Sequence, residues 1–378
     1  MSSTADFDRL RKELNRAERE EEMRGKGKIF TKILLTVFFV IVGIIAVGGI
    51  AVLAMRIAGG NSLKKTVAGQ VPVLTDDTSG KIETLTEDDG TWQEGYITFN
   101  GKTYVYKEDI LTFLVLGVDK DGEAETTDEF AGGGQSDGIF LVVCDPEDKA
   151  VKVIAVNRDT IVPIKMPGGS LDGSDAVTHA QLSTQYGFGD GGESSCELVK
   201  ETVSDLFCGL PISGYASIRM TAVPIINDAV DGVSVTVNED MTKAKKGWNE
   251  GETIDLHGQD AYTYVRWRNK DNFESARMRL DRQKRFLSAF ITKARAETKK
   301  DITLPVKIFN EISDYMVTDF TASEVAYMAS EYLGYSFDAS SIITLEGETK
   351  QGEKFEEFYP DEDKLKEMMI EVFYKEVN

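Results

Sequence analysis

The stretch Leu111-Thr-Phe-Leu-Val-Leu-Gly-Val118 decides the fold, because it is a continuous apolar run that ends directly before a charged residue. A strand that is buried on both faces of a sheet gives such a run, whereas a half-exposed strand alternates apolar and polar residues. Residues 139–144 and 151–156 are two further runs of this kind, and residues 146–149 between them form a turn. The three runs predict buried strands of a single sheet.

Helical and strand patterns alternate along the rest of the chain. The expected helices lie at residues 174–186, 193–210, 220–230, 258–266, 277–299, 321–333 and 361–374. Further strands are expected at residues 215–219, 233–237 and 341–345. This alternation is typical of an α/β domain, in which helices cover a layered sheet.

Residues 33–55 form an apolar segment of another kind, with 23 residues and no charged side chain. This length is sufficient for a helix to cross a bilayer. Basic residues are denser before the segment than after it, which favours a cytoplasmic N-terminus. A cleaved signal peptide is the alternative, but its apolar region would be shorter and its charged leader less long. We therefore expect a single-pass protein of the cell membrane with an extracellular main domain.

The domain boundaries follow from composition. Residues 1–32 are expected as the cytoplasmic tail, 33–55 as the transmembrane helix and 56–93 as an extracellular stalk rich in Gly, Ser, Thr and Asp. A β-hairpin is expected at 94–109, because alternating aromatic and β-branched residues flank Asn100-Gly101, a strong type I′ turn signal. Residues 110–300 form the core of the main domain, and 301–378 form a C-terminal α/β extension of the same domain.

The charge balance excludes one class of partner. The chain has 43 Lys and Arg residues against 64 Asp and Glu residues, a net charge of −21. Residues 57–378 alone contain 33 basic and 57 acidic residues, a net charge of −24. Such a domain does not hold nucleic acid by general electrostatic attraction. An anionic ligand must therefore be bound by a local group of positive side chains.

Cysteine and histidine usage excludes several kinds of site. The three cysteines, Cys144, Cys196 and Cys208, do not have the spacing of a disulfide framework or a metal site. The two histidines, His179 and His257, lie far apart and belong to no zinc motif. A GxSxG element that would support a Ser-His-Asp triad is also absent from the sequence.

Two aspartates flank the first two predicted strands. Asp119 directly follows the first strand, and Asp137 directly precedes the second, after a Gly-rich stretch. If these strands are antiparallel neighbours, both carboxylates lie at one edge of the sheet and suit Mg²⁺. The alternative is that each Asp only makes a turn. As metal ligands, both are expected to tolerate replacement by Asn with little change in stability, since removing a like-charge pair relieves repulsion.

Arginines gather in two other segments. Arg158 and Asp159 follow the third strand, and ligands of open α/β sheets bind at strand ends, although such a pair can also be purely local. Five arginines then occur within 17 positions: Arg266, Arg268, Arg277, Arg279 and Arg282. On a helix Arg279, Arg282 and Gln283 would share one face. Guanidinium groups match phosphate oxygens in a bidentate manner, but a solvated face paired with nearby acidic residues is an equal alternative.

These stretches together resemble the LytR-CpsA-Psr family of envelope proteins. The resemblance covers residues 109–287, and also includes the short charged tail and single apolar segment at the N-terminus. The matching stretches are Phe113-Leu-Val-Leu-Gly-Val-Asp119, Gln135-Ser-Asp137, Val156-Asn-Arg-Asp-Thr160, Asp231-Gly-Val233, Gly258-Gln-Asp-Ala-Tyr-Thr-Tyr-Val-Arg-Trp-Arg268 and Arg279-Leu-Asp-Arg-Gln283. Their order and spacing, rather than any single piece, carry the resemblance.

The resemblance implies an α/β/α sandwich with a central mixed sheet and a phosphotransferase activity at the surface of a Gram-positive bacterium. Such an enzyme moves an anionic glycopolymer, of the wall teichoic acid or capsule type, from a polyprenyl-pyrophosphate carrier to a muramic-acid hydroxyl of peptidoglycan. Mg²⁺ would bridge the pyrophosphate and be held by Asp119 and Asp137. An apolar tunnel would take the prenyl chain.

The resemblance also implies roles for the remaining site residues. Arg158, Arg266, Arg268 and Arg279 would bind the pyrophosphate, with Gln283 and Gln135 beside them. Asp159 would orient Arg158 or help to activate the acceptor hydroxyl. The residues implied in catalysis are therefore Asp159, Arg158, Arg266 and Arg268.

The sequence departs from the family pattern at three positions. Gln135 replaces an arginine, which removes one positive charge, and Asn157 replaces a proline, which changes the backbone. Ala276 replaces an aspartate, for which Glu274 or Asp271 are candidate substitutes.

Two other functions compete with the transferase. The same site could hydrolyse a prenyl pyrophosphate, as a phosphatase or pyrophosphatase does. The chain could also be a non-catalytic module that binds lipid-linked glycans or regulates envelope synthesis. Direct control of transcription is disfavoured, because the N-terminal tail is too short for a DNA-binding domain and has no helix-turn-helix pattern.

Overall fold

The computed structural model describes residues 57–78, 80–84, 96–129, 131–169, 174–269 and 275–377. The chain divides into two compact units, Met1–Met55 and Arg56–Asn378, and only the second is described here. The predicted cytoplasmic tail and transmembrane helix lie outside the described residues. Among the residues that are described, no helix is both long enough and apolar enough to cross a membrane.

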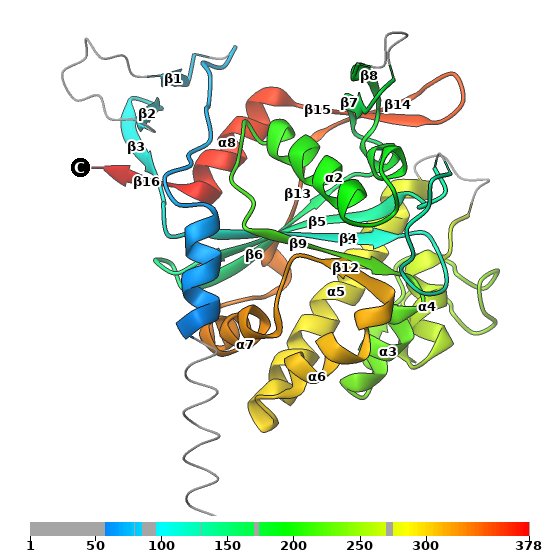
Figure 1. Ribbon diagram of the computed structural model, residues 1–378. Coiled ribbons are helices and arrows are strands. Elements are labelled where there is room, and N and C mark those ends of the chain that lie inside the picture. The colour runs from blue at the N-terminus through cyan, green and yellow to red at the C-terminus, as the bar shows by residue number, and fades with distance from the viewer. Residues whose placement is uncertain are drawn as a thin grey trace, which may run out of the picture. The chain divides into compact units, whose positions relative to one another are not determined.

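A six-stranded mixed sheet forms the centre of the second unit (Figure 1). Its strand order is β12-β9-β4-β5-β6-β13. β4 pairs antiparallel with β5 and parallel with β9, while β6 pairs antiparallel with β5 and parallel with β13. The bounds are β4 Leu111–Val118, β5 Ser136–Asp145, β6 Ala150–Val156, β9 Gly214–Arg219, β12 Met316–Thr318 and β13 Ile342–Thr344. The prediction that the three apolar runs are buried neighbouring strands is confirmed.

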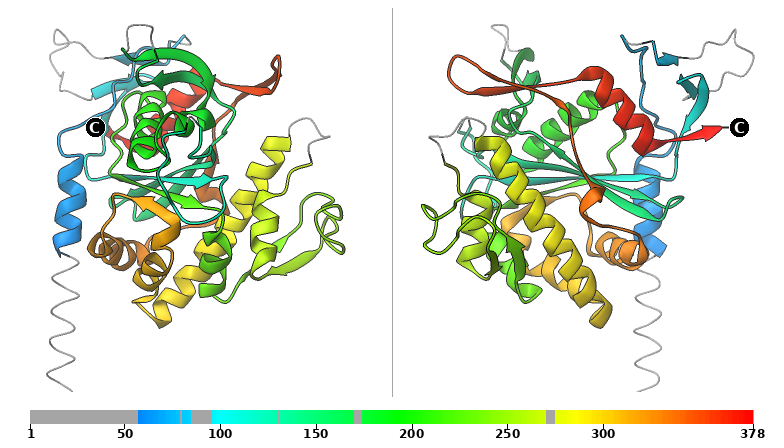
Figure 2. Two further views of the ribbon diagram at one scale, coloured as in Figure 1. Left: turned by 45° about the vertical axis from the view of Figure 1, so that its right-hand side comes forward. Right: turned by 180° about the vertical axis from the view of Figure 1, so that it is seen from behind.

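Helices cover both faces of this sheet, as the two views of Figure 2 show. Leu114 and Leu116 of β4 belong to a core that also contains residues of α2 (Glu193–Leu206) and α8 (Glu362–Phe373). On the other face, strand residues such as Val153 pack with Leu280 and Leu287 of α5 (Ser275–Lys300). The three-layer α/β/α arrangement follows from strands that are apolar on both sides.

A second, smaller core lies beside α5. It surrounds Trp248 and Tyr264, whose rings meet edge to face with centroids 6.0 Å apart. Its elements are α3 (Ala222–Ala229), β10 (Val233–Thr236), β11 (Thr253–Leu256), α4 (Gln259–Arg266) and α6 (Leu304–Glu311). The predicted strand at 233–237 is confirmed, but among the described strands it pairs with β11 alone and does not join the main sheet.

Three further small sheets complete the unit. A four-stranded sheet has the order β1-β2-β3-β16, and two hairpins are formed by β7 with β8 and by β14 with β15. Their bounds are β1 Ile82–Thr84, β2 Tyr96–Phe99, β3 Lys102–Tyr106, β16 Tyr374–Val377, β7 Ile161–Met166, β8 Ala176–Gln181, β14 Gly347–Gln351 and β15 Glu356–Pro360. The predicted turn at Asn100-Gly101 is confirmed, with φ values of 51° and 73° that fit type I′.

The segment predicted as a stalk is part of the domain wherever it is described. Residues 57–66 form a helix, and β1 pairs antiparallel with β2. Leu63 is buried in a cluster with Phe113 and Tyr327. Gly59 and Gly60 of this helix lie so close to α7 (Ala322–Glu331) that a Cβ atom on either would overlap Ser323 or Tyr327. The few apolar residues of this segment therefore pack against the domain, and the described part of the segment is not a free linker.

The helix predicted at 174–186 is wrong. Residues Ala176–Gln181 form β8, followed by the 3₁₀ helix η2 at Leu182–Phe188. The physical reason is β7, a half-exposed strand that the sequence pattern did not indicate, whose backbone groups pair with β8 over its whole length. The helix predicted at 193–210 ends earlier, at Leu206, because Cys208 and Gly209 adopt positive φ.

The other predicted helices are confirmed within one to two residues. α7 begins with a capping box, in which Thr321 and Glu324 exchange hydrogen bonds. α8 is capped by Asp361, the first residue of the predicted range, but it ends at Phe373 and the chain continues as β16. Short 3₁₀ turns occur at η3 Ser313–Tyr315, η4 Tyr332–Gly334 and η5 Ala339–Ser341.

Candidate functional site

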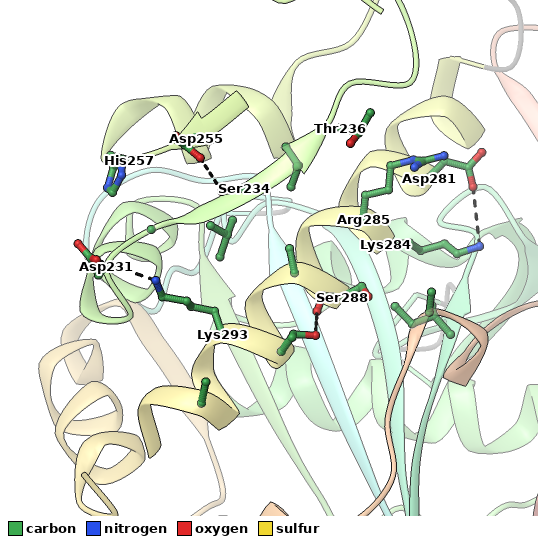
Figure 3. Close-up of a pocket in the computed structure, with 18 residues that line it drawn as sticks. Asp231, Ser234, Thr236, Asp255, His257, Asp281, Lys284, Arg285, Ser288 and Lys293 are labelled. Atoms are coloured by element: carbon green, nitrogen blue, oxygen red, sulfur yellow. Dashed lines mark hydrogen bonds and ion pairs between the residues drawn. The ribbon is translucent and has the colours of Figure 1, made fainter. Parts of the chain in front are cut away.

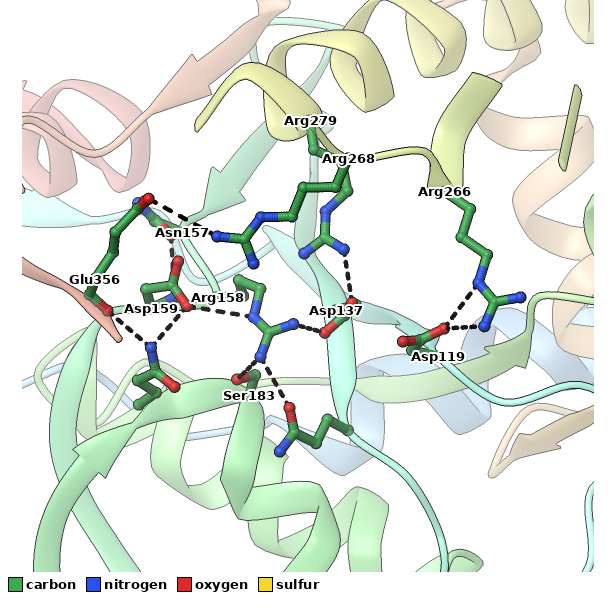
Figure 4. A network of polar contacts seen from close by, with 12 residues as sticks. Asp119, Asp137, Asn157, Arg158, Asp159, Ser183, Arg266, Arg268, Arg279 and Glu356 are labelled. Carbon is green, nitrogen blue, oxygen red and sulfur yellow. Dashed lines mark hydrogen bonds and ion pairs between the residues drawn. The ribbon is translucent and has the colours of Figure 1, made fainter. Parts of the chain in front are cut away.

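Three strand ends bring the predicted site residues to one edge of the sheet (Figure 4). Since β5 is antiparallel to both β4 and β6, its first residues lie beside the last residues of those strands. The backbone N–H of Asp119 donates to the carbonyl of Gln135, at 3.0 Å. The expectation that Asp119 and Asp137 lie at the same edge is confirmed. We call the group Asp119, Asp137, Arg158, Asp159, Arg266, Arg268 and Arg279 the arginine site.

Asp137 is the centre of this arrangement. Gly117 pairs with Gly138, while Val118 pairs with Ser136, so Asp137 is the extra residue of a β-bulge. A bulge redirects a side chain at the end of a ladder. Asp137 Oδ1 accepts a hydrogen bond from Nη1 of Arg158, and Oδ2 accepts one from Nη1 of Arg279 at 2.7 Å. One carboxylate thus holds together two arginines that are 121 positions apart in the sequence.

Arg158 is fixed by several acceptors. Its Nη2 donates to Oε1 of Gln135 at 2.8 Å and to Oγ of Ser183 at 3.0 Å. Its Nε lies 3.3 Å from Oδ1 of Asp159 and makes no hydrogen bond to any residue that the structure describes. The guanidinium plane is therefore oriented by groups from the β4–β5 loop, from η2 and from its own strand end.

Asp159 is almost completely buried beside Arg158. Its Oδ1 accepts a hydrogen bond from Nε2 of Gln181 at 2.9 Å, and its backbone N–H donates to Oδ1 of Asn157 at 3.0 Å. No hydrogen bond to Oδ2 comes from the described residues. Burial raises the pKa of Asp159 above the usual range of a carboxyl group, although the charges of Arg158, Arg268 and Arg279 oppose this shift.

The other three arginines surround the two aspartates. Arg279 is buried, which lowers its pKa, and its Nη2 atom has no hydrogen-bond partner in the part of the chain described. Arg268 donates from Nε to Oγ of Ser275 at 2.8 Å. Arg266 lies further out, with Nε and Nη2 at 3.1 and 3.0 Å from Oδ1 of Asp119. The arginine site therefore has donor groups that the protein itself does not use.

Two residues of the predicted arginine cluster have other contacts. Arg282 is buried, pairs with Glu239 and donates from Nε to the carbonyl of Tyr264 at 3.2 Å. Gln283 donates to the carbonyl of Val265, at 3.3 Å, so its expected role beside the pyrophosphate stays a prediction. Arg279 and Arg282 are both on α5, as expected, but Arg282 bonds to Glu239 and to the backbone carbonyls of Tyr264 and Trp267, whereas Arg279 bonds to Asp137. The solvated-face alternative is wrong for these two buried side chains.

Several neighbours of the site were not indicated by the sequence. Gln181 and Ser183 lie in the segment that was predicted as a helix, and Glu356 lies in an unpredicted hairpin. Gln181 Nε2 donates to the carbonyl of Glu356 at 2.8 Å, and Oε1 of Glu356 lies 3.8 Å from Nη2 of Arg268. Asp121 accepts from both Arg266 and Tyr262, so it extends the Asp119 end of the site. Asp121 could have been proposed from the sequence, because it follows Asp119 by two residues at the same strand end.

The structure shows the contacts of the three residues that depart from the family pattern. Gln135 accepts a hydrogen bond from Arg158, so it orients that arginine where an arginine would repel it. Asn157 replaces the rigidity of proline with a side-chain hydrogen bond to the backbone of Asp159. Ala276 is buried in the first turn of α5, and its two candidate substitutes lie outside the described residues.

The contacts of Asp119 and Asp137 can be compared with what a Mg²⁺ ion requires of its ligands. The described residues contain no group of three or more His, Cys, Asp or Glu side chains that could hold a metal ion. Mg²⁺ is often bound by one or two carboxylates together with phosphate oxygens and water. Asp119 and Asp137 would fit that limited set, but both already accept hydrogen bonds from arginines. A cation here would therefore need oxygens from a substrate.

An apolar cavity lies on the α5 side of the same sheet. It has a volume of about 400 Å³ and is lined by Phe113 and Val142 from the sheet, Leu287 and Ile291 from α5, and Met328 from α7, among others. Leu287 is two turns of α5 from Arg279, about 12 Å along the helix axis. On the sheet, the facing pair Gly117 and Gly138 lies between Asp137 and this cavity. The next pair on this face, Val115 and Phe140, stands between the two glycines and Phe113 and Val142 of the cavity. The Phe140 ring lies over Gly138, with Cε2 3.3 Å from the position that a Cβ atom of Gly138 would take.

Comparison with known proteins agrees with this arrangement. The LytR_cpsA_psr family model matches residues 73–372. A teichoic acid transferase named TagU from Bacillus cereus, called polyisoprenyl-teichoic acid–peptidoglycan teichoic acid transferase, is 25% identical over 283 residues, which are 75% of this chain and 81% of the relative.

Solved structures show the same fold. The crystal structure of Bacillus subtilis TagV has a TM-score of 0.52 and 22% identity, covering 70% of this chain and 95% of that one. TagT bound to LIIa-WTA has a TM-score of 0.52 and 21% identity, covering 70% of this chain and 89% of that one. Since the family model spans most of the sequence, the chain belongs to the LytR_cpsA_psr family.

Proposed function

We propose that this chain transfers an anionic glycopolymer from a polyprenyl-pyrophosphate carrier to peptidoglycan. The observation that carries the proposal is the convergence of four arginines at the sheet edge, next to an apolar cavity on the same helix and strands. The names of relatives such as TagU, a teichoic acid transferase, support the same polymer and acceptor classes. The donor molecule has an anionic headgroup, which the arginine site would bind, and a long apolar tail, which the neighbouring cavity would bind.

The arginines supply the binding of pyrophosphate. Arg279 Nη2 and Arg158 Nε have no hydrogen-bond partner among the described residues, and they would gain acceptors from phosphate oxygens. Each charge-assisted contact of this kind contributes about 1.5–3 kcal/mol. Arg266 and Arg268 are less buried, and they would close on the diphosphate from the outer side. This local positive charge overcomes the average repulsion of an acidic domain.

Phosphoryl transfer depends on position and charge neutralisation more than on covalent catalysis. When bound, Mg²⁺ would neutralise charge on the pyrophosphate, with Asp119 and Asp137 as its protein ligands. The acceptor hydroxyl attacks the phosphorus that carries the polymer, a new P–O–C bond forms, and the P–O–P bond breaks. Polyprenyl phosphate is the leaving group.

Asp159 is the candidate to receive the proton of the attacking hydroxyl. Its Oδ1 is engaged by Gln181, while Oδ2 has no hydrogen bond from the described residues. A raised pKa makes the ionised carboxylate a stronger base than an exposed aspartate. The same side chain also orients Arg158 through its contact with Nε.

The prenyl chain is proposed to lie in the cavity between the sheet and α5. Its lining is almost wholly apolar, with side chains from β4, β5, α5 and α7. The first isoprene units would pass from the headgroup over Gly117 and Gly138 and along the Phe140 ring to the cavity. We further propose that residues 33–55 anchor the chain in the cell membrane with the domain outside.

The transfer reaction tests this function directly. The full chain in detergent is incubated with a polyprenyl-pyrophosphate-linked glycan, peptidoglycan fragments and Mg²⁺. The expected products are polyprenyl phosphate and a glycan joined to the fragments through a phosphodiester. Free glycan phosphate in place of the joined product would identify the chain as a hydrolase, and binding without turnover would make it a non-catalytic lipid-glycan module.

A further inference from the structure

A groove of about 1010 Å³, lined by both charged and apolar side chains, lies between α5 and β10 (Figure 3). The residues of α5 that line it, among them Lys284, Arg285 and Ser288, belong to the helix face turned away from Arg279 and Leu287. The groove is thus separate from both the arginine site and the apolar cavity, although it shares their central helix. No part of the proposed reaction uses it so far.

The groove follows the edge of a strand. Every residue from 231 to 236 lines it. Since successive side chains of a strand point to opposite faces, a consecutive run of lining residues means that the groove runs along the strand edge. β10 pairs with β11 alone among the described strands, so its other edge is open.

The ladder shows which backbone groups point into the groove. The N–H of Val237 donates to the carbonyl of Glu252 at 2.9 Å, and the carbonyl of Val237 accepts from the N–H of Gly251 at 2.8 Å. Hydrogen-bonded positions alternate along an antiparallel pair. Val235 therefore also bonds to β11, while Ser234 and Thr236 direct their backbone N–H and C=O groups away from it.

A positively charged side chain lies at each end of this edge, but only one of the two lacks an acidic partner among the described residues. Lys293 lies 3.9 Å from Asp231 and closes the groove at the start of β10, as Figure 3 shows. Arg285 lies toward Thr236 in Figure 3, without a hydrogen bond or ion pair to any described residue. Lys284 is held by Thr344, to which it donates at 2.6 Å. The Thr236 end of the groove therefore offers a guanidinium group to an anion.

We propose that this groove binds a short, extended peptide with a free carboxylate, namely the stem peptide of the peptidoglycan acceptor. The peptide would add to β10 through the backbone groups of Ser234 and Thr236, and its carboxylate would contact Arg285. The four residues of β10 offer an edge of about 13 Å, which suits a few residues of extended chain.

This inference rests on the proposed function, because it names the part of the acceptor that the enzyme recognises. In peptidoglycan the muramic acid that carries the accepting hydroxyl also carries the peptide on its lactyl group. Arg285 is six residues from Arg279, about 9 Å along the α5 axis. A peptide held on one face of α5 would therefore keep its own sugar near the arginines on the other face.

The anionic donor polymer fits the groove less well. Asp231, Asp255 and Asp281 also line it and would repel a chain of repeated negative charges. An unpaired strand edge gives alternating donors and acceptors, which match a peptide backbone and not a polyanion. The polymer remains one outcome of the test.

Calorimetric titration of the full chain in detergent tests the inference without any donor lipid. The probes are a muropeptide, the same peptide alone, and the same disaccharide without peptide. The muropeptide and the peptide are expected to bind, and the bare disaccharide to bind at least tenfold more weakly.

Two variants test the contacts. Thr236→Pro removes an N–H that points away from β11, so the ladder should survive while muropeptide affinity falls about tenfold or more. Arg285→Gln should cost a similar factor, because it removes a charge-assisted contact. Ser234→Ala keeps the backbone groups and Lys307→Gln removes an exposed cation elsewhere, and both should bind like the unaltered chain.

The inference is overturned if the bare disaccharide binds as well as the muropeptide, or if Arg285→Gln and a folded Thr236→Pro both retain full affinity. Stronger binding of free polymer than of peptide would also overturn it. If Thr236→Pro fails to fold, the affinity of Arg285→Gln alone tests the inference, because replacing an exposed side chain should not prevent folding. Muropeptide binding with no polymer transfer would refute the proposed function and leave the groove assignment intact.

Discussion

Replacing Asp137 with Asn tests whether the arginine site is built around a shared carboxylate. The side chains of Asp137, Arg158 and Arg279 are only 9%, 15% and 8% exposed, and both carboxylate oxygens accept from arginines. Removing one partner of a buried ion pair costs about 3–5 kcal/mol, since the remaining charge stays buried without compensation. Here two guanidinium groups would remain, so we expect the free energy of unfolding to fall by about 3 kcal/mol or more.

This expectation reverses the one drawn from the sequence, in which Asp137 belonged to a like-charge pair and could be replaced at little cost. Asp119→Asn is the matched control, because the same change occurs at the same sheet edge. Asp119 and Arg266 are about 40% and 39% exposed at their side chains, and such a pair contributes about 0–1 kcal/mol.

Urea unfolding of both variants in one detergent, followed by circular dichroism, measures the difference. Inorganic pyrophosphate should raise the stability of Asp137→Asn more than that of the unaltered chain, because the anion replaces the missing countercharge. The reasoning is refuted if Asp137→Asn loses no more stability than Asp119→Asn. It is equally refuted if pyrophosphate stabilises neither protein.

Four further predictions concern activity and topology. Arg279→Lys keeps the charge but loses the second donor arm, so turnover should fall about tenfold or more with little loss of fold, measured as polymer transfer beside an unaltered chain. Gly138→Leu should reduce turnover of long-chain donors while a donor with a short prenyl chain is still used; equal loss for both chain lengths would contradict the proposed lipid path. Burial raises the pKa of Asp159, so protonation favours the folded state: this group stabilises the fold below the pKa it has when unfolded, and that contribution is lost as pH rises through the folded-state value. Asp159→Asn should therefore not lower stability at neutral pH, while it abolishes the acid limb of the rate profile; an unchanged pH–rate profile would exclude Asp159 as the base. A reporter fused after Asn378 should be active only outside the cytoplasm if residues 33–55 form a membrane anchor, and a C-terminus that external protease cannot reach in wall-stripped cells would contradict it.

The centre of the fold was predictable because its strands are buried on both faces. Three continuous apolar runs in the sequence predicted these strands, at residues 111–118, 139–144 and 151–156. All three are strands of the main sheet. The exposed hairpins were not predictable in this way. Val177, Thr178 and His179 of β8 are all exposed, so the segment lacks the alternation of buried and exposed residues that would distinguish a strand from a helix.

The charged centre of the site was predictable from strand ends, but its supporting contacts were not. Antiparallel pairing places Asp119 and Asp137 at one edge, and this follows from the order of two strands alone. The contact between Gln181 and Glu356 joins residues 175 positions apart, through two hairpins that no local pattern indicated. Arg282 was part of the predicted arginine cluster because of its spacing from Arg279. In the structure it pairs instead with the buried Glu239, outside the arginine site.

The close contact of the helix at residues 57–66 with α7 has a mechanical consequence for the apolar cavity. Glycine in a helix interior costs about 1 kcal/mol relative to alanine, and this helix has two in succession where α7 approaches. Leu63 and Val67 pack behind Phe113, Cys144 and the α7 residues that form the cavity wall. This buttress precedes residues 73–372, which match the family model. The cavity wall is therefore supported from behind by a segment that lies outside the residues matched by the family model.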